Sequence, residues 1–358
     1  MIALIYLSGL LSISAFEALM ILLFPLALYL LRRDKSGLFL PLSLHAISLN
    51  LSTLVYAPHG ILLSMERSLL LFNFSLGRFF RLNELFINRL IILTGLMILP
   101  YSLYTYLKTS EPSVIWGGWF ETGAFYSLFC LSALALFIKS GRISYLFLAF
   151  VFAFVVILTA RRSSIVALFL IVVISFFMFF PKRKALTYSF GVFALAIGLS
   201  LIVFLKDPRF GSLLDGFNLS SFDRFSSNRL ELALRGLEII SISLKEGRWF
   251  SLIFGNGILP GSRLNPPSHV GGTYESVFFI SETVEKGLLG LAGILILWVR
   301  YFRFLLSVRL SRENALILPF LMMLGWHLLS SVFTHFWDAL LPMYLIFFRV
   351  AMLKLRAN

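Results

Sequence analysis

The chain has 358 residues, of which 59% are hydrophobic and only 13% are charged, whereas a soluble domain carries roughly 25% charged residues. With a mean hydropathy of +0.91, this composition excludes a soluble globular protein and predicts an integral membrane protein. The formal net charge of +14 would indicate nucleic-acid binding in a soluble protein. Here most Lys and Arg residues stand at the ends of apolar runs, as in the cytoplasmic loops of membrane proteins, so no nucleic-acid partner is expected.

The apolar runs predict transmembrane helices. Few of them alternate polar and apolar residues as barrel strands do, and a helix satisfies its own backbone polar groups. Because a span needs about 20 apolar residues, we expect an all-α polytopic bundle of about 11 (10–12) helices, in a single integral-membrane domain over residues 1–358. The expected spans lie near residues 5–31, 37–56, 60–77, 85–107, 117–138, 144–160, 163–181, 185–205, 272–299, 314–334 and 338–353. The first run is long enough to bend or to form a hairpin, and residues 67–90 could equally form an interfacial helix.

Six groups of basic residues test this layout. They are Arg32, Arg33 and Lys35; Arg78 and Arg81; Lys139 and Arg142; Lys182, Arg183 and Lys184; Arg300 to Arg312; and Lys354 with Arg356. Alternating spans put all six groups on one side, which the positive-inside rule identifies as the cytoplasm. The C-terminus is therefore expected in the cytoplasm. The turn with Arg161 and Arg162 and the long segment 206–271 then face the opposite side.

Segment 206–271 is the one extended polar region, and we expect it to form a loop that caps the bundle. Within it a helix is predicted over about 228–246, where Asn228 can cap and Glu231 stands at the third position of a capping box. Glu231 and Arg235 can also pair at i,i+4 spacing. Four residues are expected to form its apolar stripe: Leu230, Leu234, Leu237 and Ile240. The stretch "FGNGILPGSRLNPPSHVGG" that follows predicts an ordered loop, because its glycines and prolines exclude regular structure.

Arginine side chains at three positions indicate anion binding. A charge at hydrocarbon depth costs on the order of 2.5 to 3.5 kcal/mol, yet Arg161 and Arg162 interrupt an apolar run and lie on the side where basic residues are rare. Arg229 stands in the first helical turn, where a cation opposes the helix dipole. Guanidinium groups suit a diphosphate, because their planar fork donates bidentate hydrogen bonds. The alternatives are snorkelling to lipid headgroups, a surface position for Arg229, or a role for Arg224, Arg235 or Arg263 instead.

Glu275 is the candidate general base. In "GGTYESVFFISETVEKGLLG" a 3.6-residue period puts Glu275, Phe279, Glu282 and Lys286 on one face, and Glu282 can pair with Lys286. Glu275 is then left at the outer mouth of the span, where burial raises and arginines lower a carboxyl pKa. The alternative is an N-terminal carboxylate that the helix dipole stabilises.

Histidines compete for the base role. His269 precedes Glu275 by six residues, and His335 with Asp338 belongs to "FTHFWD", which the layout also places on the outer side. A single histidine beside aromatic residues more often has a packing role. His45 and His327 lie inside apolar runs and are expected to be interior polar groups with helix partners.

Several motifs are absent from the sequence. It contains no Walker-type glycine loop, HExxH, CxxC, GxSxG elbow or DxD pair, and its one cysteine, Cys130, allows no intrachain disulfide. We therefore expect no metal and no cofactor. A bound diphosphate would have to be neutralised by arginines.

Three segments together resemble the O-antigen polymerase and O-antigen ligase superfamily of membrane glycosyltransferases. "TARRSS" looks like the Thr-x-Ser-Arg segment, "SSNRLELALRGLEII…LIFGNGILPGS" like the Arg-containing helix with its Gly-x-Gly turn, and "YESVFFISETVEKGLLG" like the Glu-x-Gly-x-x-Gly element. The resemblance covers roughly residues 155–345. It implies a GT-C-like bundle in the bacterial inner membrane, with one large periplasmic loop and an active site that faces the periplasm.

Individual residues match the motifs of this superfamily. Arg162 and Arg229 match its two motif arginines, and Arg161 occupies a place usually held by a small residue. The last motif matches Glu285, Gly287 and Gly290. Ligases typically carry a His-Asn pair where this chain has Glu275 and Ser276, which favours the polymerase branch.

The expected function is therefore polymerisation of undecaprenyl-diphosphate-linked oligosaccharide units by metal-independent inverting transfer. Arg162 and Arg229, with Arg161, would bind the diphosphate, while Glu275 deprotonates the acceptor hydroxyl. Membrane lipids and a chain-length regulator protein are further candidate partners. The alternatives are an O-antigen ligase that transfers the glycan to lipid A core, a lipid-linked oligosaccharide transporter (flippase), and a non-catalytic scaffold.

Overall fold

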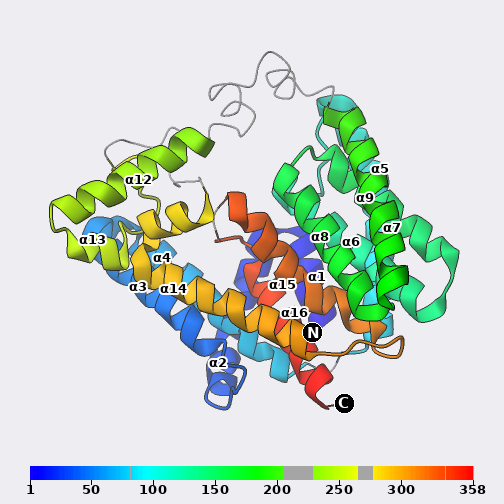
Figure 1. Cartoon of the computed structure of the whole chain (residues 1–358). Coiled ribbons are helices and arrows are strands. Elements are labelled where there is room, and N and C mark those ends of the chain that lie inside the picture. The colour runs from blue at the N-terminus through cyan, green and yellow to red at the C-terminus, as the bar shows by residue number, and fades with distance from the viewer. Residues whose placement is uncertain (81, 205–228, 265–276, 335, 358) are drawn as a thin grey trace.

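The computed structural model describes residues 1–80, 82–204, 229–264, 277–334 and 336–357, and helices make up the fold in these ranges (Figure 1). The α-helices are α1 (Ile2–Leu11), α2 (Ile13–Leu31), α3 (Phe39–Tyr56), α4 (Ile61–Leu71), α5 (Glu84–Thr109), α6 (Trp119–Ser140), α7 (Ile143–Leu158), α8 (Arg162–Phe179), α9 (Lys182–Phe204), α12 (Arg229–Lys245), α13 (Trp249–Phe254), α14 (Phe278–Ser307), α15 (Leu318–Ser330) and α16 (Leu341–Ala357). Short 3₁₀ helices are η1 (Pro58–Gly60), η2 (Phe72–Arg78), η3 (Ala315–Ile317) and η4 (Ser331–Phe333). Within the described ranges there is no strand, as predicted.

Six described helices are long and apolar enough to cross a membrane, namely α2, α3, α5, α6, α8 and α14. A polytopic helical membrane protein is therefore confirmed, but a count of about 11 spans is not. The expected span 60–77 consists of α4, with 11 residues, and a 3₁₀ helix, and α15 in the expected span 314–334 has 13 residues. Both are shorter than the about 20 residues that cross a bilayer.

The first apolar run bends, as the sequence allowed. Ser12 has extended backbone angles, with φ −165° and ψ 129°, and its hydroxyl accepts a hydrogen bond from the backbone N–H of Ala15. This cap begins α2 and separates it from α1, because a serine oxygen satisfies one of the free N–H groups of a helix N-terminus.

The bundle is built around α6. In its apolar window 89% of the residues are buried, compared with 17% for α2, so α6 is a core helix rather than a lipid-facing one. It packs against α5, α7, α8 and α15. The other half of the bundle is organised by α3 and α14, which pack along each other, and α12 and α13 lie against α14 (Figure 1).

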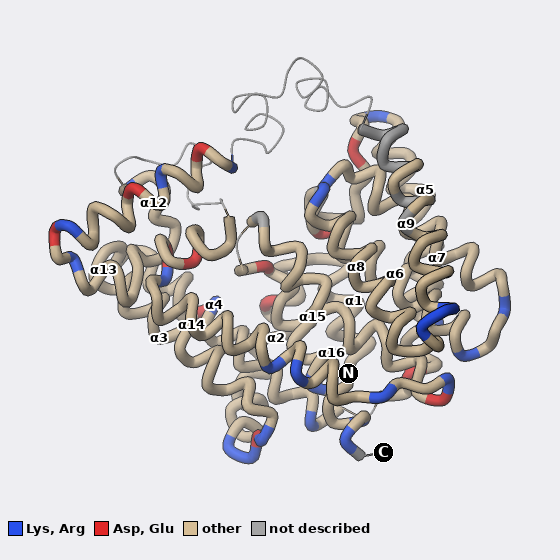
Figure 2. The backbone as a smooth tube through the Cα atoms, in the orientation of Figure 1, with Lys and Arg blue, Asp and Glu red and all other residues tan. Residues whose placement is uncertain are grey.

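The basic groups gather at one end of the bundle, as predicted (Figure 2). Contacts between them show this directly: the Arg78 guanidinium donates to the Arg33 carbonyl, and Lys139 Nζ donates to the Glu313 carbonyl at 3.1 Å. We call this the basic end. Because α7 begins directly after Arg142 and α8 ends before Lys182, the α7–α8 turn lies at the opposite end, which we call the site end. The assignment of the basic end to the cytoplasm stays a prediction.

The loop helix α12 is close to its predicted range, but the predicted stripe is wrong in part. Leu234 and Leu237 are 60% and 50% exposed. The buried face instead consists of Leu232, Ala233, Gly236, Ile239 and Ser243. Ile239 of this face packs against Val284 of α14.

Candidate functional site

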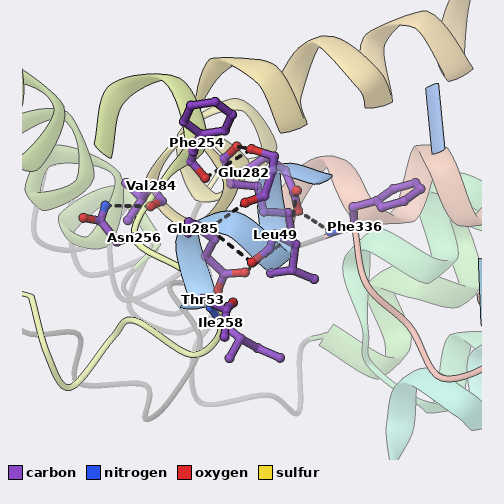
Figure 3. Close-up of polar contacts among 12 residues, drawn as sticks. Leu49, Thr53, Phe254, Asn256, Ile258, Glu282, Val284, Glu285 and Phe336 are labelled. Carbon is purple, nitrogen blue, oxygen red and sulfur yellow. Dashed lines mark hydrogen bonds and ion pairs between the residues drawn. The ribbon is translucent and has the colours of Figure 1, made fainter. Parts of the chain in front are cut away.

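Helix α14 is broken near the site end. Gly287 has φ 62° and ψ −173°, far from helical values, so carbonyl groups before it lose their helical partners. The loop after α13 supplies new ones: the Val284 carbonyl accepts from Asn256 N at 3.1 Å and Nδ2 at 2.8 Å, and the Glu285 carbonyl accepts from Gly257 N at 3.0 Å (Figure 3). Non-helical backbone at membrane depth is tolerated where protein satisfies it in this way.

Two glycines make this contact possible. A Cβ at Gly287 would lie 2.3 Å from the Ile253 carbonyl oxygen, and a Cβ at Gly255 would lie 2.3 Å from the Glu285 carbonyl oxygen. Both glycines also have positive φ, which side chains disfavour. The Gly-x-Gly turn and the Glu-x-Gly motif are therefore one structural unit, which we call the loop–break unit (residues 253–257 and 284–287).

Helix α3 anchors the loop–break unit. The Ser48 hydroxyl donates to the Phe254 carbonyl at 3.1 Å and contacts the Lys286 carbonyl as well. Thr53 Oγ1 accepts from the Ile258 N–H at 2.9 Å. The unit is thus held by backbone and short side chains, and the charged side chains of α14 remain available for other contacts.

Arg263 clamps the same loop. Its guanidinium donates to the carbonyls of Tyr56 at 2.6 Å and Ile258 at 2.7 Å. Burial lowers the pKa of Arg263 from its ordinary value, but a guanidinium remains charged at neutral pH. These contacts give Arg263 a structural role, and its alternative role as a diphosphate ligand stays a prediction.

A buried charge cluster lies on α14 beside the break. Lys286 Nζ lies 2.8 Å from Glu282 Oε2 and 3.3 Å from Glu285 Oε2. The three residues are 2%, 0% and 5% exposed, in the same order. The predicted pairing of Glu282 with Lys286 is confirmed. Since a buried unpaired charge is costly, the cluster must remain intact or acquire another counter-ion.

Arg67 is the fourth charge of this region, and the sequence did not single it out. It lies on α4 with its guanidinium 5.2 Å from the centre of the Trp337 ring, and the carboxylates of Glu285, Glu66 and Glu17 act on it electrostatically. No local pattern connects α4 with residue 337, so only packing reveals this arginine.

Glu282 links the cluster to the loop before α16. Its Oε1 accepts from the Phe336 N–H at 2.9 Å (Figure 3). The carbonyl of the same Phe336 lies 2.9 Å from His327 Nε2, and His327 Nδ1 lies 3.6 Å from Asp338 Oδ2. His327 was expected to be an interior polar group with a partner, and this is confirmed.

The contact with Phe336 sets the orientation of the His327 ring toward Asp338. A carbonyl only accepts, so Nε2 must carry the hydrogen that faces Phe336. In a neutral ring Nδ1 then presents a lone pair to the Asp338 carboxyl group.

Arg161 approaches this pair from the N-terminal end of α8, which packs against α15. Its guanidinium carbon lies 4.4 Å from the centre of the Phe120 ring, and the ring of Phe120 lies 6.4 Å from that of His327. Arg162 begins α8 beside it. Both arginines are half-buried at the site end.

The remaining predicted site residues are placed as follows. Arg229 is the first residue of α12, and Arg235 forms the predicted pair with Glu231 at 2.6 Å. Helix α12 packs against α14 and α13, which brings this arginine-bearing helix to the loop–break unit. The following lie outside the described residues: Glu275, His269, His335, Arg224, Asn228 and Ser276. In the part of the chain that is described, no group of three His, Cys, Asp or Glu side chains is arranged to hold a metal ion.

Comparison with known proteins gives one informative result. No family model matches the chain. A protein of Aquifex aeolicus (strain VF5), described as "Uncharacterized protein", is 37% identical over 364 residues. The match covers 96% of this chain and 93% of that protein, so it spans nearly the whole bundle.

Proposed function

The chain belongs to the same family as the Aquifex aeolicus protein, and we propose that it is a polysaccharide polymerase of the O-antigen type. It would join undecaprenyl-diphosphate-linked oligosaccharide units at the periplasmic face of the bacterial inner membrane. The observation that carries the proposal is the loop–break unit. In the sequence, the Gly-x-Gly turn and the Glu-x-Gly-x-x-Gly element each resemble the superfamily as separate motifs. In the structure they contact each other and form this one unit.

Charge supports the proposal as well. Arg161 stands beside the ring of Phe120, and Arg67 stands beside the ring of Trp337 on the other half of the bundle. The Phe120 ring lies 6.4 Å from the His327 ring, and His327 Nδ1 lies 3.6 Å from Asp338, the residue after Trp337. A diphosphate ester carries two negative charges. If arginines neutralise it, cations are needed on both sides of the polar region that binds it.

The proposed reaction is an inverting displacement. The acceptor hydroxyl oxygen forms a bond to the anomeric carbon of the donor sugar, and the bond from that carbon to the diphosphate oxygen breaks. The bonding electrons leave with the diphosphate, whose negative charge Arg162, Arg229 and Arg161 stabilise. The hydroxyl proton passes to a general base, for which Glu275 is the candidate.

The test uses purified protein in detergent with a diphosphate-lipid oligosaccharide as the only substrate. A polymerase produces a ladder of products longer than one repeat. Arg162→Ala and Arg229→Ala should each lower the rate by roughly 100- to 1,000-fold, as for loss of a group that stabilises transition-state charge. Arg142→Ala, at the basic end, is the matched control and should leave the rate unchanged. Full activity of both site variants would refute the roles of these arginines, whereas the absence of a ladder with the wild type would refute the polymerase.

Two further outcomes separate the alternatives. Transfer that occurs only after lipid A core is added identifies a ligase. If Glu275→Gln retains full activity, the base is His269 or His335 instead.

A transporter for lipid-linked oligosaccharide is the second candidate, and one observation favours it. Broken helices and buried charges at membrane depth are typical of transporters, and α14 has both features. A transporter would move the lipid-linked oligosaccharide across vesicle membranes and leave its length unchanged. The same incubation therefore distinguishes the two functions.

A further inference from the structure

A cavity of about 590 Å³ opens at the basic end, far from the loop–break unit. It lies between the last turns of α14 and α16 and the turn that joins α2 to α3. Its lining residues are Ser36, Leu38, Leu295, Ile296, Val299, Arg300, Arg303, Phe304, Ser307, Phe348, Met352 and Arg356. The α14 members recur at three- and four-residue spacing, so one continuous face of this helix forms a wall of the cavity.

The charged side chains of this cavity are all cationic. Arg300, Arg303 and Arg356 line it, and among its described lining residues there is no Asp or Glu. The nearby carboxylate of Asp34 is already paired, with its Oδ1 2.6 Å from Arg349 Nη2. Three guanidinium groups around one cavity repel each other unless an anion lies between them.

The wall beside these arginines is apolar and open to the surroundings. Val299 and Leu295 are exposed on α14, about one and two turns before Arg303. The Phe304 ring lies 5.7 Å from the Arg356 guanidinium carbon. A ligand that fills the cavity must therefore combine a negative head with hydrocarbon that runs along α14 toward the middle of the membrane.

We propose that this cavity binds the phosphate headgroup of an anionic glycerophospholipid. The three arginines hold the phosphate oxygens by charge-assisted, bidentate hydrogen bonds, and the acyl chains lie over Leu295 and Val299. Basic pockets between helices at the cytoplasmic surface bind anionic lipid headgroups in this way. The site is independent of the proposed glycosyl transfer, because its residues lie at the other end of the bundle.

The test is native mass spectrometry of the full-length protein. Dioleoyl-phosphatidylglycerol and dioleoyl-phosphatidylcholine, which share acyl chains, are titrated separately. The wild type should retain one phosphatidylglycerol with clear preference over phosphatidylcholine. The triple variant Arg300→Gln/Arg303→Gln/Arg356→Gln should bind it roughly 100-fold more weakly, since each basic residue near a membrane surface contributes roughly fivefold.

The matched control removes the same charge elsewhere at the basic end. Arg142→Gln/Arg183→Gln/Lys184→Gln changes exposed residues outside the cavity, and it should keep wild-type binding. The single variant Arg303→Gln should bind phosphatidylglycerol roughly fivefold more weakly than the wild type. It tests the proposal if the triple variant fails to fold. If the control variant loses as much phosphatidylglycerol binding as the triple variant of the cavity arginines, the proposal is overturned. Complete displacement of phosphatidylglycerol by inorganic phosphate would also overturn it, because the site would then bind small anions.

Discussion

Gly287→Ala tests whether the broken helix determines the structure of the site end. An alanine at φ 62° and ψ −173° occupies a region that is essentially restricted to glycine, at a cost of about 1–3 kcal/mol. Its Cβ would also meet the Ile253 carbonyl oxygen at 2.3 Å, and a backbone group cannot rotate away. We therefore expect the loop after α13 to separate from α14.

The magnitude follows from the contacts that would be lost. Three hydrogen bonds join Asn256 and Gly257 to carbonyls of α14, and each contributes about 0.5–1.5 kcal/mol. Together with the backbone strain, Gly287→Ala should lower the free energy of unfolding by about 3–7 kcal/mol. Asn256→Ala, which removes only side-chain contacts, should lower it by about 1–2 kcal/mol.

The assay combines two measurements in mixed micelles. Denaturant titration gives the free energy of unfolding, and hydrogen exchange reports on the amides of Asn256 and Gly257. Gly191→Ala is the matched control, because a Cβ there has no neighbour within 4 Å, and it should stabilise α9 by about 0.5–1 kcal/mol. The reasoning fails if Gly287→Ala keeps wild-type protection at both amides and unfolds within about 0.5 kcal/mol of wild type.

Two further predictions concern the buried polar groups. Lys286→Met leaves the buried carboxylates of Glu282 and Glu285 without this cation and should cost about 3–5 kcal/mol in denaturant titration. Lys286→Met/Glu282→Gln should recover part of that loss, because Arg67 still acts on Glu285; a double variant no more stable than the single one contradicts this account. Asp338→Ala removes the partner of His327 Nδ1 and should cost about 1–3 kcal/mol in the same assay. Asp338→Asn can donate to that nitrogen and should remain within about 1 kcal/mol of wild type, so equal losses in the two variants would show that Asp338 does not act through His327 Nδ1.

The sequence determined those features that depend on composition and on neighbours within one helix. Membrane insertion follows from apolar runs, and the common end of the basic groups follows from their position between spans. The pairs Glu282–Lys286 and Glu231–Arg235 follow from i,i+4 spacing, which fixes neighbours on any helix.

The sequence alone was less informative about the faces of the helices. In a membrane protein both the lipid-facing and the buried side of a helix are apolar, so an apolar stripe does not identify the packed face. In α12, which lies outside the spans, Leu234 and Leu237 were expected in the apolar stripe, whereas the buried face consists of Leu232, Ala233, Gly236, Ile239 and Ser243.

Only the tertiary structure decided which distant residues form the site. Three contacts join segments that are far apart in the sequence: Gly255 with Glu285, Arg67 with Trp337, and Arg161 with Phe120. Such contacts depend on how close two backbones approach and on where one helix is broken, and neither property is encoded in local periodicity. The motifs could therefore be read in order along the chain, but their assembly into one site required the packing of α3, α13 and α14.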